Sequence, residues 1–97
     1  MEQILNYLMN ELQQSERVAN RNAAKLCKYD DIRTEFLEWV ATGEFKEEGV
    51  VIEGYNAKKI AELAPFMNGV GVFNFMVTLR DNPEIAMQTI AAGFPRK

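Results

Sequence analysis

The sequence contains no histidine, one cysteine and one serine, and these absences restrict its chemistry. Histidine is the commonest general acid or base, the base of serine and cysteine triads, and the commonest zinc ligand. With Cys27 as the only cysteine, no intramolecular disulfide can form. Ser15 has no accompanying base that would make it a nucleophile. We therefore expect a protein that is not an enzyme and that holds no metal or organic cofactor.

The sequence also shows no pattern that suggests secretion and no long apolar run. It has no basic start followed by an apolar stretch and a small-residue cleavage site. The longest segment without a charge, residues 63–79, contains Pro65, Asn68, Gly69 and Gly71. A membrane-spanning helix needs about 20 mostly apolar residues with regular backbone. We expect no membrane span and a cytoplasmic location.

Size and composition indicate one globular domain. A chain of 97 residues with 47% hydrophobic side chains can form a single core. The net charge is −3, and it is uneven: residues 1–49 carry six basic and ten acidic side chains, a net −4, whereas residues 50–97 carry five and four, a net +1. This acidic balance disfavours non-specific nucleic-acid binding, which depends on neutralising phosphates with lysine and arginine.

Apolar spacing and capping residues predict three helices in the first half of the chain. Ile4, Leu8 and Leu12 and their neighbours recur at intervals of three and four, which predicts a helix over residues 2–14. Beyond Ser15 a sparser apolar pattern predicts further helix, either continuous with the first or after a break; its residues are Val18, Ala19, Ala23, Leu26 and Cys27. A third should begin at Asp30 as its N-cap and end at Gly43.

The next segment, residues 44–54, has the composition of an acidic loop. It ends in a run of β-branched residues at 50–52, which is typical of a short strand. No partner strand is evident from the sequence.

The second half again shows helix boundaries. Asn56 can cap a helix over 57–64, which Pro65 limits, and Asn82 with Pro83 can start a helix that ends before Gly93. Between them, residues 70–80 fit both the alternation of a strand and the spacing of a helix. The helical flanks favour a helix.

Together these patterns predict a mainly α fold: a single small helical domain, residues 1–97, of four to six helices with at most a short β element near residues 50–53. The N-terminal helices would occupy 1–43, the acidic loop and strand 44–54, and the C-terminal helices 55–97. The side chains expected in the core are Phe36, Trp39, Val40, Ile60, Phe73, Phe75, Met76 and Leu79.

The second half of the chain carries a family resemblance. EGYNAKKIAEL at 53–63, followed by GVGVFNFMVTLRDNPEIAMQTIAAGFPRK at 69–97, is similar to the endings of short uncharacterised proteins of Gram-positive bacteria and their mobile elements. Those endings resemble G-Y-T-A-K-x-L, an aromatic-rich segment ending in L-R, then P-E-x-A and a terminal glycine. Asn56 replaces the usual threonine. The resemblance supports the segment boundaries and implies no activity.

Four cations are evenly spaced in the second predicted helix. Arg17, Arg21, Lys25 and Lys28 follow one another at intervals of four, four and three, which places them on one side of a helix. Such a row could contact a phosphate backbone or an acidic protein surface. It could equally be the solvated face of the helix.

A helix-turn-helix is a second nucleic-acid hypothesis. Residues 57–64 would form the first helix, 65–69 the turn and 70–80 the reading helix, with Asn74, Thr78 and Arg80 as base or phosphate contacts. The turn is longer than the usual three to four residues. The many apolar side chains of residues 70–80 suit a central helix better.

Among binding functions, the sequence favours a small protein-binding adaptor or inhibitor, of phage or mobile-element origin and compatible with a homodimer. Its size, its acidic balance, its lack of catalytic groups and its aromatic and methionine content support this hypothesis, because those residue types are enriched at protein interfaces. A nucleic-acid-binding regulator with a helix-turn-helix-like C-terminal half is the alternative.

Overall fold

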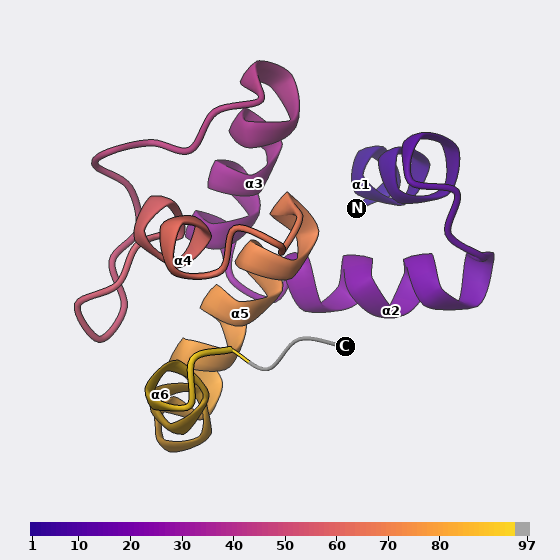
Figure 1. The fold of residues 1–97 in the computed structure, drawn as a ribbon. Coiled ribbons are helices and arrows are strands. Elements are labelled where there is room, and N and C mark those ends of the chain that lie inside the picture. Colours follow the sequence, from indigo (N-terminus) through magenta and orange to yellow (C-terminus); the bar gives the residue numbers. More distant parts are fainter. Residues whose placement is uncertain (95–97) are drawn as a thin grey trace.

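The computed structural model describes residues 1–94 and is mainly helical, as the sequence predicts. Six α-helices and one π-helical segment make up the described part of the chain (Figure 1). In order they are α1 (Glu2–Asn6), η1 (Tyr7–Glu11), α2 (Glu16–Leu26), α3 (Asp30–Thr42), α4 (Ala57–Leu63), α5 (Gly69–Asp81) and α6 (Pro83–Ala91). Within residues 1–94, no helix is both long enough and apolar enough to cross a membrane.

Helix α5 is the centre of the fold. It packs against α2, α3, α4 and α6, which surround it in Figure 1. Asn68 caps its start by accepting a hydrogen bond from the Gly71 N–H at 2.8 Å. Its buried side chains lie on several sides of the helix: Val70, Val72, Phe73, Met76, Val77 and Leu79. Residues 70–80 are therefore helical, and their mixed periodicity reflects burial on more than one side.

The first helix is shorter than predicted. After Asn6 the chain widens into η1, where the Leu12 N–H donates to the Tyr7 carbonyl at 3.3 Å, and the helical segment ends at Glu11 rather than at residue 14. Gln13 then takes a left-handed conformation with φ of 55°. Ser15 accepts a hydrogen bond from the Val18 N–H and caps α2, so a break separates the first helical segment from the second.

Helix α3 confirms one predicted boundary and shifts the other. Gly43 ends the helix in the left-handed conformation, with φ of 75°, which glycine adopts without steric cost. At the start, Tyr29 and not Asp30 is the N-cap residue. Asp30 and Asp31 lie in the first turn, where acidic side chains interact favourably with the helix dipole.

The β element near residues 50–53 reduces to a single bridge between Ile52 and Tyr55, and no strand forms within residues 1–94. The two residues exchange backbone hydrogen bonds of 2.9 Å in both directions. Between them Glu53 and Gly54 have positive φ values of 53° and 82°, a feature of tight type I′ turns. The pairing partner that the sequence did not reveal is therefore Tyr55, only three residues further along the chain. Asn56 then caps α4 as predicted, accepting from the Lys59 N–H at 2.8 Å.

The C-terminal boundary follows its sequence signals closely. Pro83 is the first residue of α6, and Gly93 lies beyond its end with φ of 81°. The Phe94 N–H donates to Thr89 and the Gly93 N–H to Ile90, which is the paired arrangement of a Schellman motif. Phe94 is buried and packs edge-on against Phe75, with ring centroids 4.8 Å apart.

Most of the expected core is buried. Phe36, Ile60, Phe73, Met76 and Leu79 are at most 1% exposed. Three expected core residues are only partly buried: Trp39, Val40 and Phe75. Trp39 and Val40 lie in the last turns of α3, and Phe75 lies in α5.

Candidate functional site

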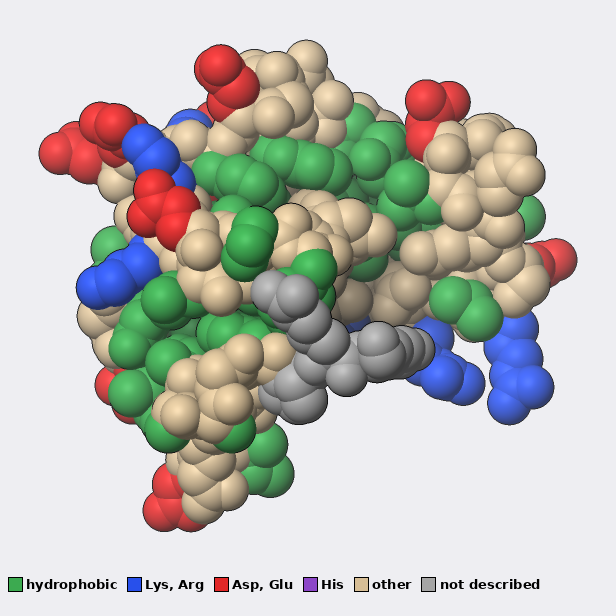
Figure 2. Space-filling view, viewed as in Figure 1, with side chains coloured by type: hydrophobic (Ala, Val, Ile, Leu, Met, Phe, Trp, Pro, Cys, Tyr) green, Lys and Arg blue, Asp and Glu red, His purple; other side chains and the backbone are tan. Residues whose placement is uncertain are grey.

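The most distinctive surface of the described chain is an aromatic hollow with an acidic rim. It lies between the second half of α3, the loop that follows it and the middle of α5, and encloses about 200 Å³. Its lining residues are Glu35, Glu38, Trp39, Thr42, Glu44, Phe45, Lys46 and Phe73. Figure 2 shows hydrophobic side chains exposed across the upper middle of the molecule, in the region of α3.

Local structure explains how the aromatic rings meet. Because Gly43 ends α3 in a left-handed conformation, the chain turns back and brings Phe45 over Trp39, with ring centroids 5.8 Å apart and planes 21° apart. Phe36 packs on Trp39 at 5.9 Å, and Phe73 of α5 approaches Phe45 at 6.0 Å. Such offset and tilted arrangements stabilise aromatic pairs beyond the area they bury.

A second hollow of about 580 Å³ adjoins the first. It is lined by Gly43, Glu44, Phe45, Glu47, Lys58, Ala61 and Glu62. Glu44 and Phe45 border both hollows, so the two form one continuous surface. We call the lining of both hollows the acidic aromatic face.

The charge of this face is negative. It contains five carboxylates, Glu35, Glu38, Glu44, Glu47 and Glu62, and two ammonium groups, Lys46 and Lys58, which gives a net −3. Figure 2 shows acidic and basic side chains gathered at the left-hand edge of the molecule, the edge where Figure 1 places the loop after α3.

Both lysines of the face are already paired. Lys46 Nζ lies 2.6 Å from Glu38 Oε2, and this hydrogen bond raises the pKa of Lys46, with Glu35 acting in the same direction. Lys58 Nζ lies 2.9 Å from Glu47 Oε1, which raises the pKa of Lys58 and lowers that of Glu47. Both pairs use other carboxylates, so Glu35, Glu44 and Glu62 form no ion pair within residues 1–94.

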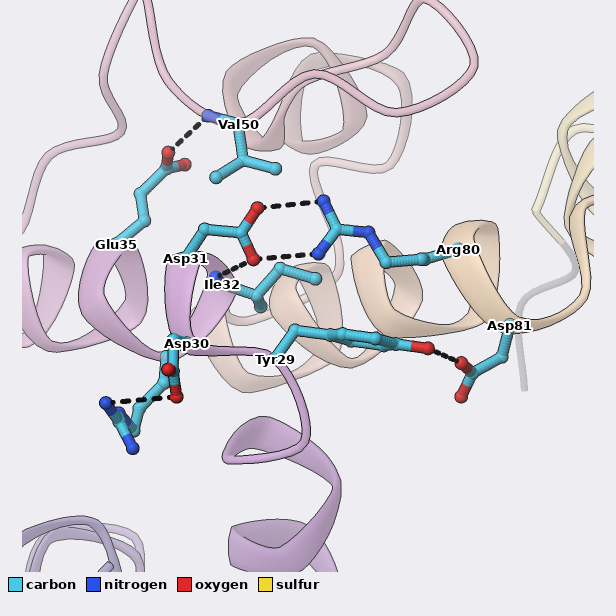
Figure 3. Close-up of polar contacts among 9 residues, drawn as sticks. Tyr29, Asp30, Asp31, Ile32, Glu35, Val50, Arg80 and Asp81 are labelled. Atoms are coloured by element: carbon cyan, nitrogen blue, oxygen red, sulfur yellow. Dashed lines mark hydrogen bonds and ion pairs between the residues drawn. The ribbon is translucent and has the colours of Figure 1, made fainter.

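Glu35 is the one buried charged residue of the described chain, at 5% exposure. Its Oε1 accepts a hydrogen bond of 2.7 Å from the Val50 N–H, as Figure 3 shows. Gly49 lies so close to this carboxylate that a Cβ at position 49 would overlap it. The contact ties the acidic loop to α3, and sequence analysis did not single out Glu35 because its role depends on a loop residue far along the chain.

The predicted row of cations is divided by the fold. Lys25 Nζ donates to Thr78 Oγ1 at 2.9 Å, and Lys28 forms an ion pair with Asp81 at 2.7 Å. Arg17 in the first turn of α2 and Arg21 in its middle are exposed. Figure 2 shows basic side chains projecting beneath the part of the surface that α2 occupies. Lys25 in the last turn of α2 and Lys28 just beyond it therefore connect this part of the chain to α5.

Arg80 also contacts the protein itself. Its Nη1 and Nη2 atoms donate to the two carboxylate oxygens of Asp31 at 2.7 and 2.8 Å, and its guanidinium lies 4.7 Å from the ring centroid of Tyr29 (Figure 3). Tyr29 in turn donates its hydroxyl hydrogen to Asp81. Hydrogen bonds from Arg80 lower the pKa of Asp31. The pKa of Asp81 is lowered most by its hydrogen bond from Lys28 and next by that from Tyr29.

The other two predicted contacts of residues 70–80 point to neighbouring helices. Asn74 Nδ2 donates to Asn22 Oδ1 at 3.3 Å, whereas Asn74 Oδ1 is buried without a hydrogen-bond partner among the described residues. Thr78 accepts from Lys25 and donates to the Asn74 carbonyl. Because Asn74, Thr78 and Arg80 all have contacts within the molecule, the arrangement disfavours α5 as a helix that reads DNA.

The described residues offer no evident metal site. Within residues 1–94, no three histidine, cysteine, aspartate or glutamate side chains are placed to hold an ion. Cys27 is half-buried at the end of α2 and packs against the core. The contacts observed among the site residues are ion pairs, hydrogen bonds and aromatic stacking.

Comparisons of the chain with protein-family models, with curated proteins and with solved structures find no match.

Proposed function

We propose that the protein is a non-enzymatic adaptor or inhibitor that binds a basic surface of a protein partner through its acidic aromatic face. The observation that carries this proposal is the face itself, a concave surface with aromatic rings at its floor and a net charge of −3. Aromatic residues are enriched at protein interfaces, and opposite surface charge accelerates and orients association. On the resemblance of its C-terminal half, we extend the proposal to a phage or mobile-element origin.

The alternative, a nucleic-acid-binding regulator, keeps one supporting observation. Arg17 and Arg21 are exposed on α2 and could approach phosphates. The other five predicted contact residues form hydrogen bonds or ion pairs within the protein: Lys25, Lys28, Asn74, Thr78 and Arg80. Two exposed arginines in an acidic protein make a weaker case than the acidic aromatic face, so we rank this alternative second.

Capture of partners from native lysate, with matched charge-reversal variants, tests the proposal. The variant Glu44→Lys/Glu47→Lys changes two exposed residues of the face, and Arg17→Glu/Arg21→Glu changes two exposed residues of α2. We expect capture of a protein that survives nuclease treatment and the α2 variant and is lost with the face variant. Circular dichroism establishes that each variant is folded.

Three results would count against the proposal. Capture that depends on nucleic acid would favour the alternative. Loss of the partner with the α2 variant and not with the face variant would move the interface to α2. Recovery of the protein only as a homodimer, measured by sedimentation and unaffected by Glu44→Lys/Glu47→Lys, would show that self-association does not use this face.

A further inference from the structure

The smaller hollow of the acidic aromatic face has a charge that its own residues do not balance. Lys46 is paired with Glu38, which leaves the carboxylates of Glu35 and Glu44 and a net charge of −2 around about 200 Å³. Glu35 is fixed in position, because it is 5% exposed and one of its oxygens accepts from the Val50 N–H. An occupant of this hollow should therefore carry positive charge.

The hollow already stabilises one cation. The ammonium group of Lys46 lies at its rim, 2.6 Å from Glu38 Oε2, and the neighbouring carboxylates favour its charged form. Because Lys46 is 47% exposed and paired at the rim, it does not fill the aromatic floor. The ion pair between Lys46 and Glu38 shows that the rim stabilises positive charge. The aromatic floor is left free for a side chain of a partner.

The aromatic floor favours a planar cation. Phe45 packs toward Trp39 and also borders both hollows, so part of its half-buried ring faces the open surface. A guanidinium can stack on an aromatic ring and at the same time donate hydrogen bonds in its plane to carboxylates. A lysine ammonium is a compact, strongly hydrated charge without such a plane.

We propose that the hollow between α3, Phe45 and α5 anchors an arginine side chain of the protein partner, with its guanidinium over Phe45 and its charge balanced by Glu35 and Glu44. This inference rests on the proposed function and adds the chemical identity of the side chain that the face recognises. Buried, well-packed arginines are frequent energetic anchors of protein interfaces.

Short peptides provide a direct test. The probes are Gly-Arg-Gly-Arg-Gly, the same peptide with lysine in place of arginine, and the same peptide with citrulline, which keeps the shape of arginine without its charge. Trp39 is the only tryptophan and lines the hollow, so its fluorescence and its indole N–H resonance report occupancy. We expect the arginine peptide to perturb both signals and to bind about two- to fivefold more tightly than the lysine peptide. The citrulline peptide should produce no change.

Two variants locate the binding. Phe45→Leu keeps an apolar side chain and removes the ring, and should weaken the arginine peptide by about two- to fivefold with little effect on the lysine peptide. Glu44→Gln should weaken both peptides and reduce the salt dependence of binding. Glu84→Gln, an exposed carboxylate on α6, is the control and should change neither. If Phe45→Leu does not fold, Glu44→Gln against Glu84→Gln still decides the site.

The outcomes separate this inference from the proposed function. Equal binding of the arginine and lysine peptides, or equal effects of Glu44→Gln and Glu84→Gln, would overturn the arginine anchor. If partner capture is nevertheless lost with Glu44→Lys/Glu47→Lys, the proposed function stands and only the anchor is wrong. If the arginine peptide binds as expected but partner capture is unaffected by the face variant, the anchor site exists and the proposed function is wrong.

Discussion

The indole of Trp39 occupies the space in which a side chain at Gly69 would lie. A Cβ built on Gly69 would overlap three ring atoms of Trp39, whereas a Cβ on Gly71, two residues along α5, would meet its nearest neighbour at 3.5 Å. The backbone of the first turn of α5 therefore packs directly against the Trp39 indole of α3. This contact sets the position of Trp39, and with it the floor of the acidic aromatic face.

We expect the two glycines to respond differently to alanine. Gly69→Ala should lower the free energy of unfolding by about 1–3 kcal/mol, the usual cost of overpacking, and should shift the fluorescence of Trp39. Gly71→Ala should be neutral or stabilise by up to about 1 kcal/mol, because alanine is the better helix former. Urea unfolding followed by circular dichroism gives both values. Equal effects of the two substitutions would contradict the close contact.

The buried carboxylate of Glu35 should contribute through its hydrogen bond to the acidic loop. Glu35→Ala would leave the Val50 N–H without its acceptor, and we expect a loss of about 1–3 kcal/mol in the free energy of unfolding. Glu35→Gln retains an acceptor oxygen and should cost less. Hydrogen exchange at the Val50 amide checks the mechanism: exchange should accelerate in Glu35→Ala more than in Glu35→Gln. Unchanged exchange in both would show that the amide is protected by something else.

Acid should weaken the connection between α3 and α5. The pKa values of Asp31 and Asp81 are lowered in the folded protein by Arg80 and by Lys28, respectively. A lowered folded-state pKa means that the stabilisation is fully present above the unfolded value of about 3.9 and is lost as pH falls through the lower folded value. The melting temperature should therefore decrease as the pH falls below about 4.

The double variant Asp31→Asn/Asp81→Asn should show a smaller decrease over the same pH range, because neither side chain can then titrate. Asp30→Asn is the matched control, since Asp30 lies in the same turn but its side chain is 88% exposed. A series of thermal melts at constant ionic strength measures the difference. If the double variant and the control have the same pH dependence as the unmodified protein, the two carboxylates do not provide the acid-sensitive contacts.

The nucleic-acid alternative makes a numerical prediction about the salt dependence of binding, and the contacts seen in the fold change the expected value. Four phosphate contacts from the row of cations would give a slope of log affinity against log salt near about −3.6, at about −0.9 per contact. Lys28 is paired with the Asp81 carboxylate, whereas Lys25 keeps its charge when it donates to the neutral Thr78 hydroxyl. Three unpaired cations therefore remain, and the slope should not exceed about −2.7 in magnitude. We expect binding to duplex DNA no tighter than about 10⁻⁴ to 10⁻⁶ M. Titration over a range of salt concentrations tests this. Tight binding with the steeper slope would revive the alternative.

Helix boundaries were the features that sequence alone determined best. Gly43, Asn56, Pro83 and Gly93 all act where they were expected to, because capping and chain reversal depend on residues within about four positions of one another. The exceptions are also local. The π-helical turns of η1, and the bridge between Ile52 and Tyr55 with the positive φ of Glu53, are backbone conformations that side-chain patterns do not reveal.

What only the tertiary structure decided is which side chains face a partner and which face each other. The even spacing of Arg17, Arg21, Lys25 and Lys28 predicted a row on one side of a helix, but Lys28 lies beyond the end of α2. The spacing also could not show that Thr78 and Asp81, more than 50 positions away, would contact Lys25 and Lys28. The glutamate-rich segment after Gly43 likewise had the composition of a solvated loop. The position of this loop over Trp39 depends on two tertiary contacts: the stacking of Phe45 on Trp39 and the hydrogen bond from the Val50 N–H to Glu35. Such contacts produce no periodic pattern in a sequence.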